Sequence, residues 1–121
     1  CIPVRIRAMK PDFSTLLSYG NEATLLDKLA EATEEEMRTF REAAGRKDTE
    51  TLRVWLHHLR SSWMVLRTEA PLQRLQVLLA AGAPDEEEVH RAVTEILETG
   101  DTIMRLAREE RRKYGGKDNR N

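Results

Sequence analysis

The stretch TLRVWLHHLRSSWMVL, residues 51–66, has the spacing of apolar residues that is typical of an amphipathic helix. At about 100° per residue, its large apolar side chains fall within roughly 60° of one direction. We expect this stripe to face the core, and it consists of Leu52, Trp55, Leu56, Leu59, Trp63 and Leu66. Asp48 is a suitable N-cap, so the pattern predicts a helix over about residues 49–67.

The sequence before this helix predicts two more helical segments. Asp12 can cap a short one that Gly20 ends. Asn21 can cap a long helix that runs to about Ala44, with apolar residues at three- and four-residue steps. Gly45 follows at the position where a left-handed residue often ends a helix.

The sequence after it predicts a fourth and a fifth helix. The fourth, about residues 70–82, has Thr68 as its expected N-cap. The fifth opens at Pro84, with four acids beside the positive end of the helix dipole, and continues to the basic run RRKYGG. Gly100 inside it is either a close-packing point or a break after which Asp101 restarts the helix.

Composition and connection lengths favour one all-α domain. The chain has 121 residues, and its apolar content is mainly leucine, alanine and methionine, which are helix formers. Long amphipathic helices joined by short turns lie antiparallel. We therefore predict an antiparallel up-down four-helix bundle over residues 12–114, with a short extra N-terminal helix, an irregular leader at 1–11 and a disordered tail at 115–121.

The charged residues are unevenly distributed along the chain, although the net charge is only −1. Residues 22–50 carry nine acids against five bases, and residues 84–98 carry six acids against one base. Residues 51–83 carry four arginines against a single glutamate, so the double-histidine segment is a basic patch. Such a patch would steer an acidic partner, whereas its acidic neighbours argue against nucleic acid.

Membrane insertion and disulfide bonding play no part in the expected fold. No apolar run reaches the roughly 20 residues that span a bilayer. Cys1 is the only cysteine, so an internal disulfide is impossible. The chain is expected to make no direct membrane contact.

On the same helical wheel, His57 and His58 lie about 140° and 120° from the centre of the stripe, on opposite sides. Both are therefore predicted to point to solvent. The residues on the face of His57, at helical neighbour positions, are Arg53, Val54, Arg60, Ser61 and Met64. Two interpretations stay open: a docking surface, or the ordinary scatter of apolar residues over a protein surface.

The sequence gives less support for a metal site or for nucleophilic catalysis at the histidines. Adjacent helical residues diverge by about 100°, so His57 and His58 cannot share a metal ion. The chain has no nucleophile elbow and no glycine-rich oxyanion loop. His90, on the acidic fifth helix, is predicted to be a surface residue. No metal or cofactor is expected.

The stretch LHHLRSSWMVL resembles the phosphoacceptor helix of histidine-containing phosphotransfer (HPt) domains, whose usual pattern is His-x-Leu-Lys-Gly-Ser and, later, Leu-Gly. In this register His57 falls on the phosphoacceptor and Leu59 on the buried leucine. Arg60 replaces the lysine, Ser61 stands at the glycine, and Ser62 stands at the serine. Arginine keeps the positive charge at its position.

The resemblance to HPt domains extends over residues 12–113. Two further positions of the motif can be compared. His58 falls on the variable position after the acceptor and is interpreted as a bystander. Arg67 replaces a glycine that is common at the end of the motif, so the geometry of the helix end stays open.

The resemblance implies a phosphoryl carrier of bacterial two-component signalling, as found at the end of hybrid sensor kinases. A receiver aspartate would donate the phosphoryl group to His57, which would pass it to a receiver aspartate, with Arg60 offsetting phosphoryl charge. The partner-binding surface would comprise Arg53, Val54, Ser61, Met64 and Arg67. Response-regulator receiver domains would be the partners and would supply Mg²⁺.

The implied domain is monomeric and cytoplasmic, whether or not its parent chain is anchored in a membrane. Two alternatives stay open beside the carrier. One is a helical protein-interaction bundle whose histidine is never phosphorylated, and the other is a structural or dimerisation bundle.

Overall fold

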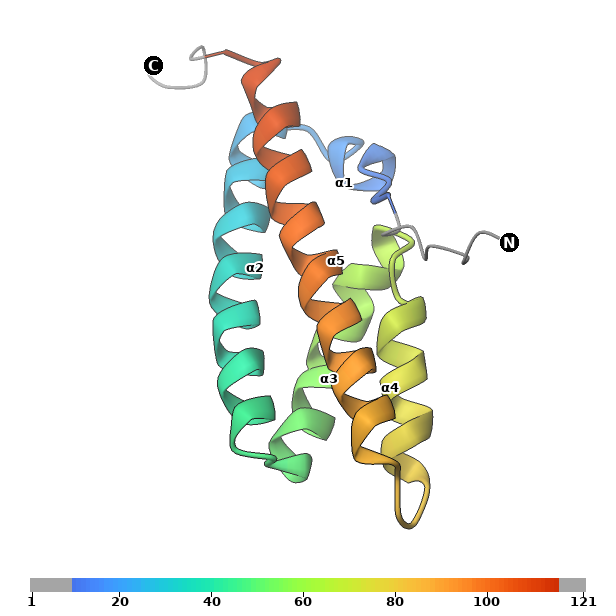
Figure 1. Cartoon of the computed structure of the whole chain (residues 1–121). Coiled ribbons are helices and arrows are strands. Elements are labelled where there is room, and N and C mark those ends of the chain that lie inside the picture. The colour runs from blue at the N-terminus through green and yellow to red at the C-terminus, as the bar shows by residue number, and fades with distance from the viewer. Residues whose placement is uncertain (1–9, 116–121) are drawn as a thin grey trace, which may run out of the picture.

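The computed structural model describes residues 10–115, and these form an all-helical chain with no strand (Figure 1). All-α was the predicted fold class, and this is confirmed. The five helices are α1 (Ser14–Leu17), α2 (Glu22–Gly45), α3 (Thr49–Val65), α4 (Ala70–Ala80) and α5 (Glu86–Arg112). The predicted leader and tail lie, for residues 1–9 and 116–121, outside the described residues.

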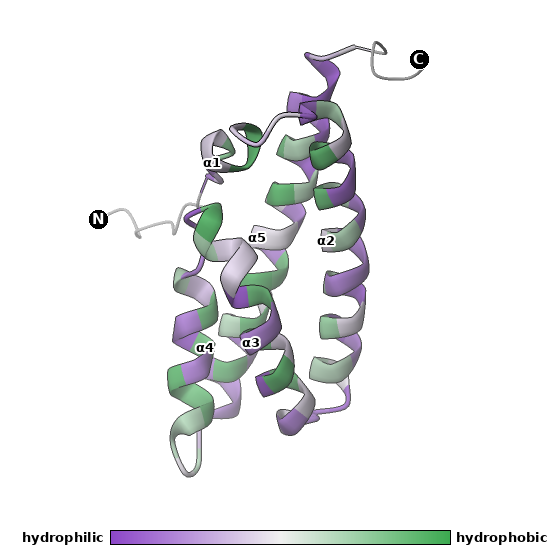
Figure 2. Cartoon of the chain, turned by 180° about the vertical axis from the view of Figure 1, so that it is seen from behind, coloured by the Kyte–Doolittle hydropathy of each residue, from purple (hydrophilic) through white to green (hydrophobic). Residues whose placement is uncertain are grey.

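The four long helices lie side by side, with α1 at one end (Figure 1). Helix α2 packs most extensively against α5, and α3 lies against α2 and α4. Along each long helix, hydrophobic and hydrophilic stretches of ribbon alternate (Figure 2), as the amphipathic spacing predicts. None of the helices in residues 10–115 combines the length and apolar character needed to cross a membrane.

One main core joins the four long helices. Its largest fully buried side chains include Trp63 of α3 and Phe40 of α2. A second, smaller cluster at the end with α1 is formed by Leu26, Ala30 and Ala107, against which Leu16 and Leu17 of α1 are packed. The short N-terminal helix thus closes this end of the core.

Helices α2 and α5 approach each other closely at Gly100. A Cβ at this position would lie 2.5 Å from Met37 Cγ on α2 and would overlap the sulfur as well. Helix α5 continues unbroken through this residue. Gly100 is therefore a close-packing point, and the alternative of a break restarted by Asp101 is wrong.

The end of α2 differs from the prediction. Gly45 is the last residue of the helix and lacks a positive φ, and the left-handed residue is Lys47, with φ 56°. The amide of Asp48 donates to the Ala43 carbonyl, and that of Lys47 to Ala44. These two bonds form a Schellman motif, which moves the left-handed position two residues beyond the glycine.

Two predicted N-caps also behave differently. Asn21 occupies the N-cap position of α2, but it is left-handed and its side chain makes no capping hydrogen bond. The N-cap of α4 is Glu69, not Thr68. Thr68 is fully buried, and its backbone amide and hydroxyl both donate to the Trp63 carbonyl at the end of α3.

Candidate functional site

The core stripe of α3 fixes which of its side chains reach solvent. Asp48 caps the helix as predicted, since its carboxylate accepts a hydrogen bond from the Thr51 amide at 3.2 Å. The predicted stripe is buried except for Trp55, which is half-buried. With this face held inward, His57 and His58 both lie exposed, which confirms their predicted orientation.

The two histidines have different surroundings. Within the part of the chain that the structure describes, the His57 imidazole has no hydrogen-bond or ion-pair partner. His58 Nε2 lies 3.3 Å from Glu36 Oε2 on α2, and its ring stands edge-on to Trp55 with 4.9 Å between centroids. His58 is thus held against the α2 side of the bundle, whereas His57 has no such contact among residues 10–115.

Glu36, which the sequence did not single out, is a half-buried carboxyl. Burial raises its pKa above the usual glutamate value, and the neighbouring His58 acts in the opposite direction through its charge and hydrogen bond. No motif or spacing marks this pair, because the two residues lie on different helices and 22 positions apart in the chain.

The face of His57 combines a cation with apolar side chains. Arg60, one turn along the helix, is exposed, and among residues 10–115 its guanidinium has no ion-pair partner. Val54 is 63% exposed and Met64 47%, both high for large apolar residues. Ser61, also exposed, adds little bulk beside the imidazole. The structure therefore brings these predicted site residues together on one open surface.

Arg53 has a structural partner in addition to its place on this face. Its Nη2 donates to the Leu79 carbonyl at 2.7 Å, near the C-terminus of α4. A cation at this end of a helix satisfies an unpaired carbonyl and complements the dipole. Arg53 thus joins α3 to α4, and this role was not visible in the sequence.

The structure shows the backbone geometry of the helix end at Arg67, which the comparison with the HPt motif left open. Its φ is 61°, in the left-handed region that favours glycine. Its amide donates to the Met64 carbonyl and that of Thr68 to Trp63, which makes a Schellman motif. Its guanidinium lies 3.6 Å from Asp12 in an exposed ion pair. The backbone therefore has here the conformation for which a glycine is suited, although the residue is arginine.

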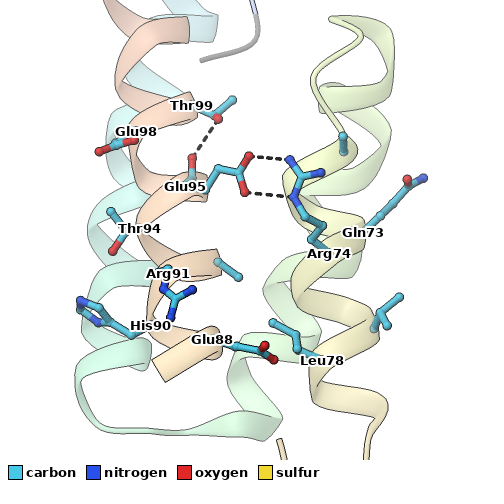
Figure 3. Close-up of a pocket in the computed structure, with 13 residues that line it drawn as sticks. Gln73, Arg74, Leu78, Glu88, His90, Arg91, Thr94, Glu95, Glu98 and Thr99 are labelled. Atoms are coloured by element: carbon cyan, nitrogen blue, oxygen red, sulfur yellow. Dashed lines mark hydrogen bonds and ion pairs between the residues drawn. The ribbon is translucent and has the colours of Figure 1, made fainter. Parts of the chain in front are cut away.

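A groove away from this face lies between α4 and α5 (Figure 3). This groove has a volume of about 890 Å³, and none of its lining residues belongs to α3. His90 lines it and is exposed, as predicted. Arg74 on α4 and Glu95 on α5 bridge it through a pair of hydrogen bonds, which raises the pKa of Arg74.

Comparison with known proteins gives no relative. A scan of protein-family models, a search of curated proteins and a search of solved structures each found no match to this chain. The geometry of α3 and the motif it carries are therefore the features that point to a function.

Proposed function

We propose that this protein is a phosphorelay intermediate of the HPt type, with His57 as the phosphoryl acceptor. The arrangement of its four long helices would be the antiparallel up-down bundle of that class, with α1 closing one end. The domain would act as a monomeric carrier in the cytoplasm, between receiver domains of two-component signalling.

The observation that carries the proposal is the state of His57. Its imidazole is exposed in the middle of a long helix that is held in the core by Leu56 and Leu59 on either side. Arg60, one turn away, has no partner within the described residues and is available to a charged group. An accessible nucleophile beside a free cation is what acceptance of a phosphoryl group from another protein requires.

The chemistry needs only the neutral imidazole from this chain. Its unprotonated ring nitrogen attacks the phosphorus of an aspartyl phosphate, and the P–O bond to the carboxylate breaks as the N–P bond forms. The aspartate leaves as a carboxylate, and the ring keeps its other N–H. Transfer onward reverses these steps on a second aspartate.

The charge that develops on the phosphoryl oxygens is offset from both sides. Arg60 would supply a guanidinium from this chain, as positive groups do in other phosphoryl transfers. Mg²⁺ and the acidic pocket would belong to the receiver. Val54 and Met64 would pack against the receiver, and Ser61 would allow it to approach the ring.

Transfer from phosphorylated receiver domains tests the proposal, with His57→Gln and His58→Gln compared with the unaltered chain. The receivers should include those encoded beside or within the parent gene. Acid-labile, base-stable label should survive His58→Gln and disappear with His57→Gln. Because both histidines are exposed, neither substitution should disturb the fold, and far-ultraviolet circular dichroism checks this.

The other results have definite meanings. Label that is lost only with His58→Gln would show that the register is wrong. No label from any receiver, combined with retained binding by both variants, would favour the interaction bundle. Self-association on size-exclusion chromatography, lost on Val54→Asp, would favour the dimerisation bundle.

A further inference from the structure

The groove between α4 and α5 is a second surface with apolar side chains, separate from the His57 face. Its apolar lining residues are Ala70, Val77, Leu78 and Ala92. Val77 is 72% exposed, although leucine and alanine side chains line the same groove. A partner that covered this valine and its neighbours would remove apolar surface from water, which favours binding.

The two walls of the groove differ in their open charges. The α4 wall carries one charge, that of Arg74, which is already satisfied by two hydrogen bonds to Glu95 across the groove. On the α5 wall, Glu88 and Glu98 have no ion-pair partner within residues 10–115. Glu88 extends towards Leu78 of α4 (Figure 3). The charges that a partner would meet on the α5 wall are therefore mainly carboxylates.

The sequence that forms the groove is strongly acidic. Residues 70–98, which contain both walls, carry six acids against two bases, a formal charge of −4. Among the described residues that line the groove, Arg91 is the one arginine or lysine besides Arg74. Lys47 of α2 reaches one of the acids, Glu86, in an exposed ion pair. Apolar walls with an acidic rim favour a basic partner and disfavour nucleic acid or an anionic membrane.

A helix is the form of polypeptide that suits the space between two helices. Residues 10–115 contain no strand, so an extended segment would find no sheet edge there and would leave backbone groups unpaired against apolar side chains. A helix satisfies its own backbone and can pack against α4 and α5 together. The apolar residues of α4 run from Ala70 to Leu78, about 12 Å along the axis. About two turns of apolar side chains on a partner helix would cover this length.

We propose that the α4–α5 groove binds a basic amphipathic helix of a partner protein. Apolar side chains along one face of that helix would cover Val77 and Leu78. Lysines or arginines beside that face would lie close to Glu88 and Glu98. The proposal does not depend on phosphotransfer, and it uses no residue of α3. The His57 face would therefore stay open in the complex.

Titration with a synthetic helix tests the proposal. The probe is an amphipathic peptide with leucines along one face and lysines on both flanks, and the matched control carries glutamates in place of the lysines. In NMR spectra of the isotope-labelled full chain, the lysine peptide should shift the amide signals of Val77, Leu78 and Ala92, and those of α3 near His57 should not move. The glutamate peptide should bind about tenfold more weakly, because it would place like charges against the rim.

Matched variants locate the site. Val77→Lys removes an apolar contact and adds a charge that repels the lysine peptide, so binding should weaken about tenfold. Val54→Lys makes the same change at an exposed site of α3 and should leave binding as it was. Glu88→Gln combined with Glu98→Gln should weaken binding a few-fold and reduce its dependence on salt. All these sites are exposed, so the fold should be retained, and circular dichroism checks this.

Four results would overturn the proposal. The first is the absence of binding by the lysine peptide, and the second is equal binding by the two peptides. The third is a set of shifts centred on α3 that Val54→Lys abolishes and Val77→Lys does not. The fourth is broadening of the groove signals that grows with protein concentration in the absence of peptide, which would mean that a second copy of the chain fills the groove.

Discussion

His58 Nε2 lies 3.3 Å from Glu36 Oε2, and this contact joins the second of two adjacent histidines to α2. Since neighbouring helical residues diverge by about 100°, the same contact cannot reach His57. One imidazole is therefore held between helices while the other faces solvent. The two positions can be tested separately.

Removal of the His58 ring should raise the pKa of Glu36 further. Burial already raises this pKa, and His58 opposes that effect through its charge and hydrogen bond. The variant His58→Ala leaves burial largely unopposed. Titration of the Glu36 carboxyl carbon by NMR measures the change. His57→Ala is the control and should leave the pKa as it is, and a lower pKa in His58→Ala would contradict the assignment.

Glu36 also predicts a sign for the pH dependence of stability. Because its folded-state pKa is raised, the folded chain binds more protons than the unfolded chain in the window above the usual glutamate pKa. The contribution of this group therefore falls as the pH rises through that window. Glu36→Gln should gain stability relative to the unaltered chain over the same range in urea unfolding. A stability difference between the two chains that stays constant over this range would contradict the prediction.

Arg60 should affect the rate of phosphoryl transfer and not the fold. Arg60→Ala is expected to slow transfer to His57 by about tenfold, which corresponds to the loss of roughly 1.4 kcal/mol from one exposed charge-assisted contact. The rate of transfer is measured from reactions with a phosphorylated receiver that are stopped at successive times. Arg53→Ala serves as a comparison, because loss of its bond to the Leu79 carbonyl should lower thermal stability as well. An unchanged rate in Arg60→Ala would remove Arg60 from the site.

Arg67→Gly should stabilise the protein. A non-glycine residue in the left-handed region costs about 1 kcal/mol, and the exposed ion pair with Asp12 returns little of it. Chemical denaturation should show a higher free energy of unfolding. Lys47 has a similar left-handed backbone conformation, so Lys47→Gly should also stabilise the protein. Arg60→Gly, in the middle of a helix, should destabilise the protein. Destabilisation by Arg67→Gly would argue against the left-handed turn.

Gly100→Ala should destabilise, although alanine is the better helix former. The added methyl would collide with Met37, and overpacking of this kind costs about 1–3 kcal/mol. Gly45→Ala is the control, since nothing lies within 4 Å of a Cβ there. In the Gly100→Ala background, Met37→Ala should be less damaging than it is alone. Additive effects in this double-mutant cycle would mean that the two residues do not touch.

The sequence predicted the helices well because their apolar spacing is long and regular. The stripe of α3 determined which way its histidines point, and Asp48 was identified as a cap from its position alone. The ends of helices were less predictable. Gly45 offered the expected left-handed residue, yet the chain continues for two residues and uses Lys47, because a Schellman motif depends on the whole turn and not on one residue type.

The candidate site, like the fold, was predicted from the sequence only in part. His57, Arg60, Val54 and Met64 share a face of one helix, so helical periodicity was sufficient to group them. Contacts between helices could not be found in this way. The pairing of His58 with Glu36, and that of Arg53 with the Leu79 carbonyl, depend on how α3 sits against its neighbours.

The close packing of Gly100 against Met37 has a consequence for synthesis on the ribosome. Helix α2 is the first long helix to be made, and α5, its main partner, is the last. Until α5 has been synthesised, the apolar face of α2 lacks its main covering partner, so an incomplete chain that ends before α5 exposes much of this face. Chaperones should therefore bind more strongly to chains that end before α5 than to chains that include it.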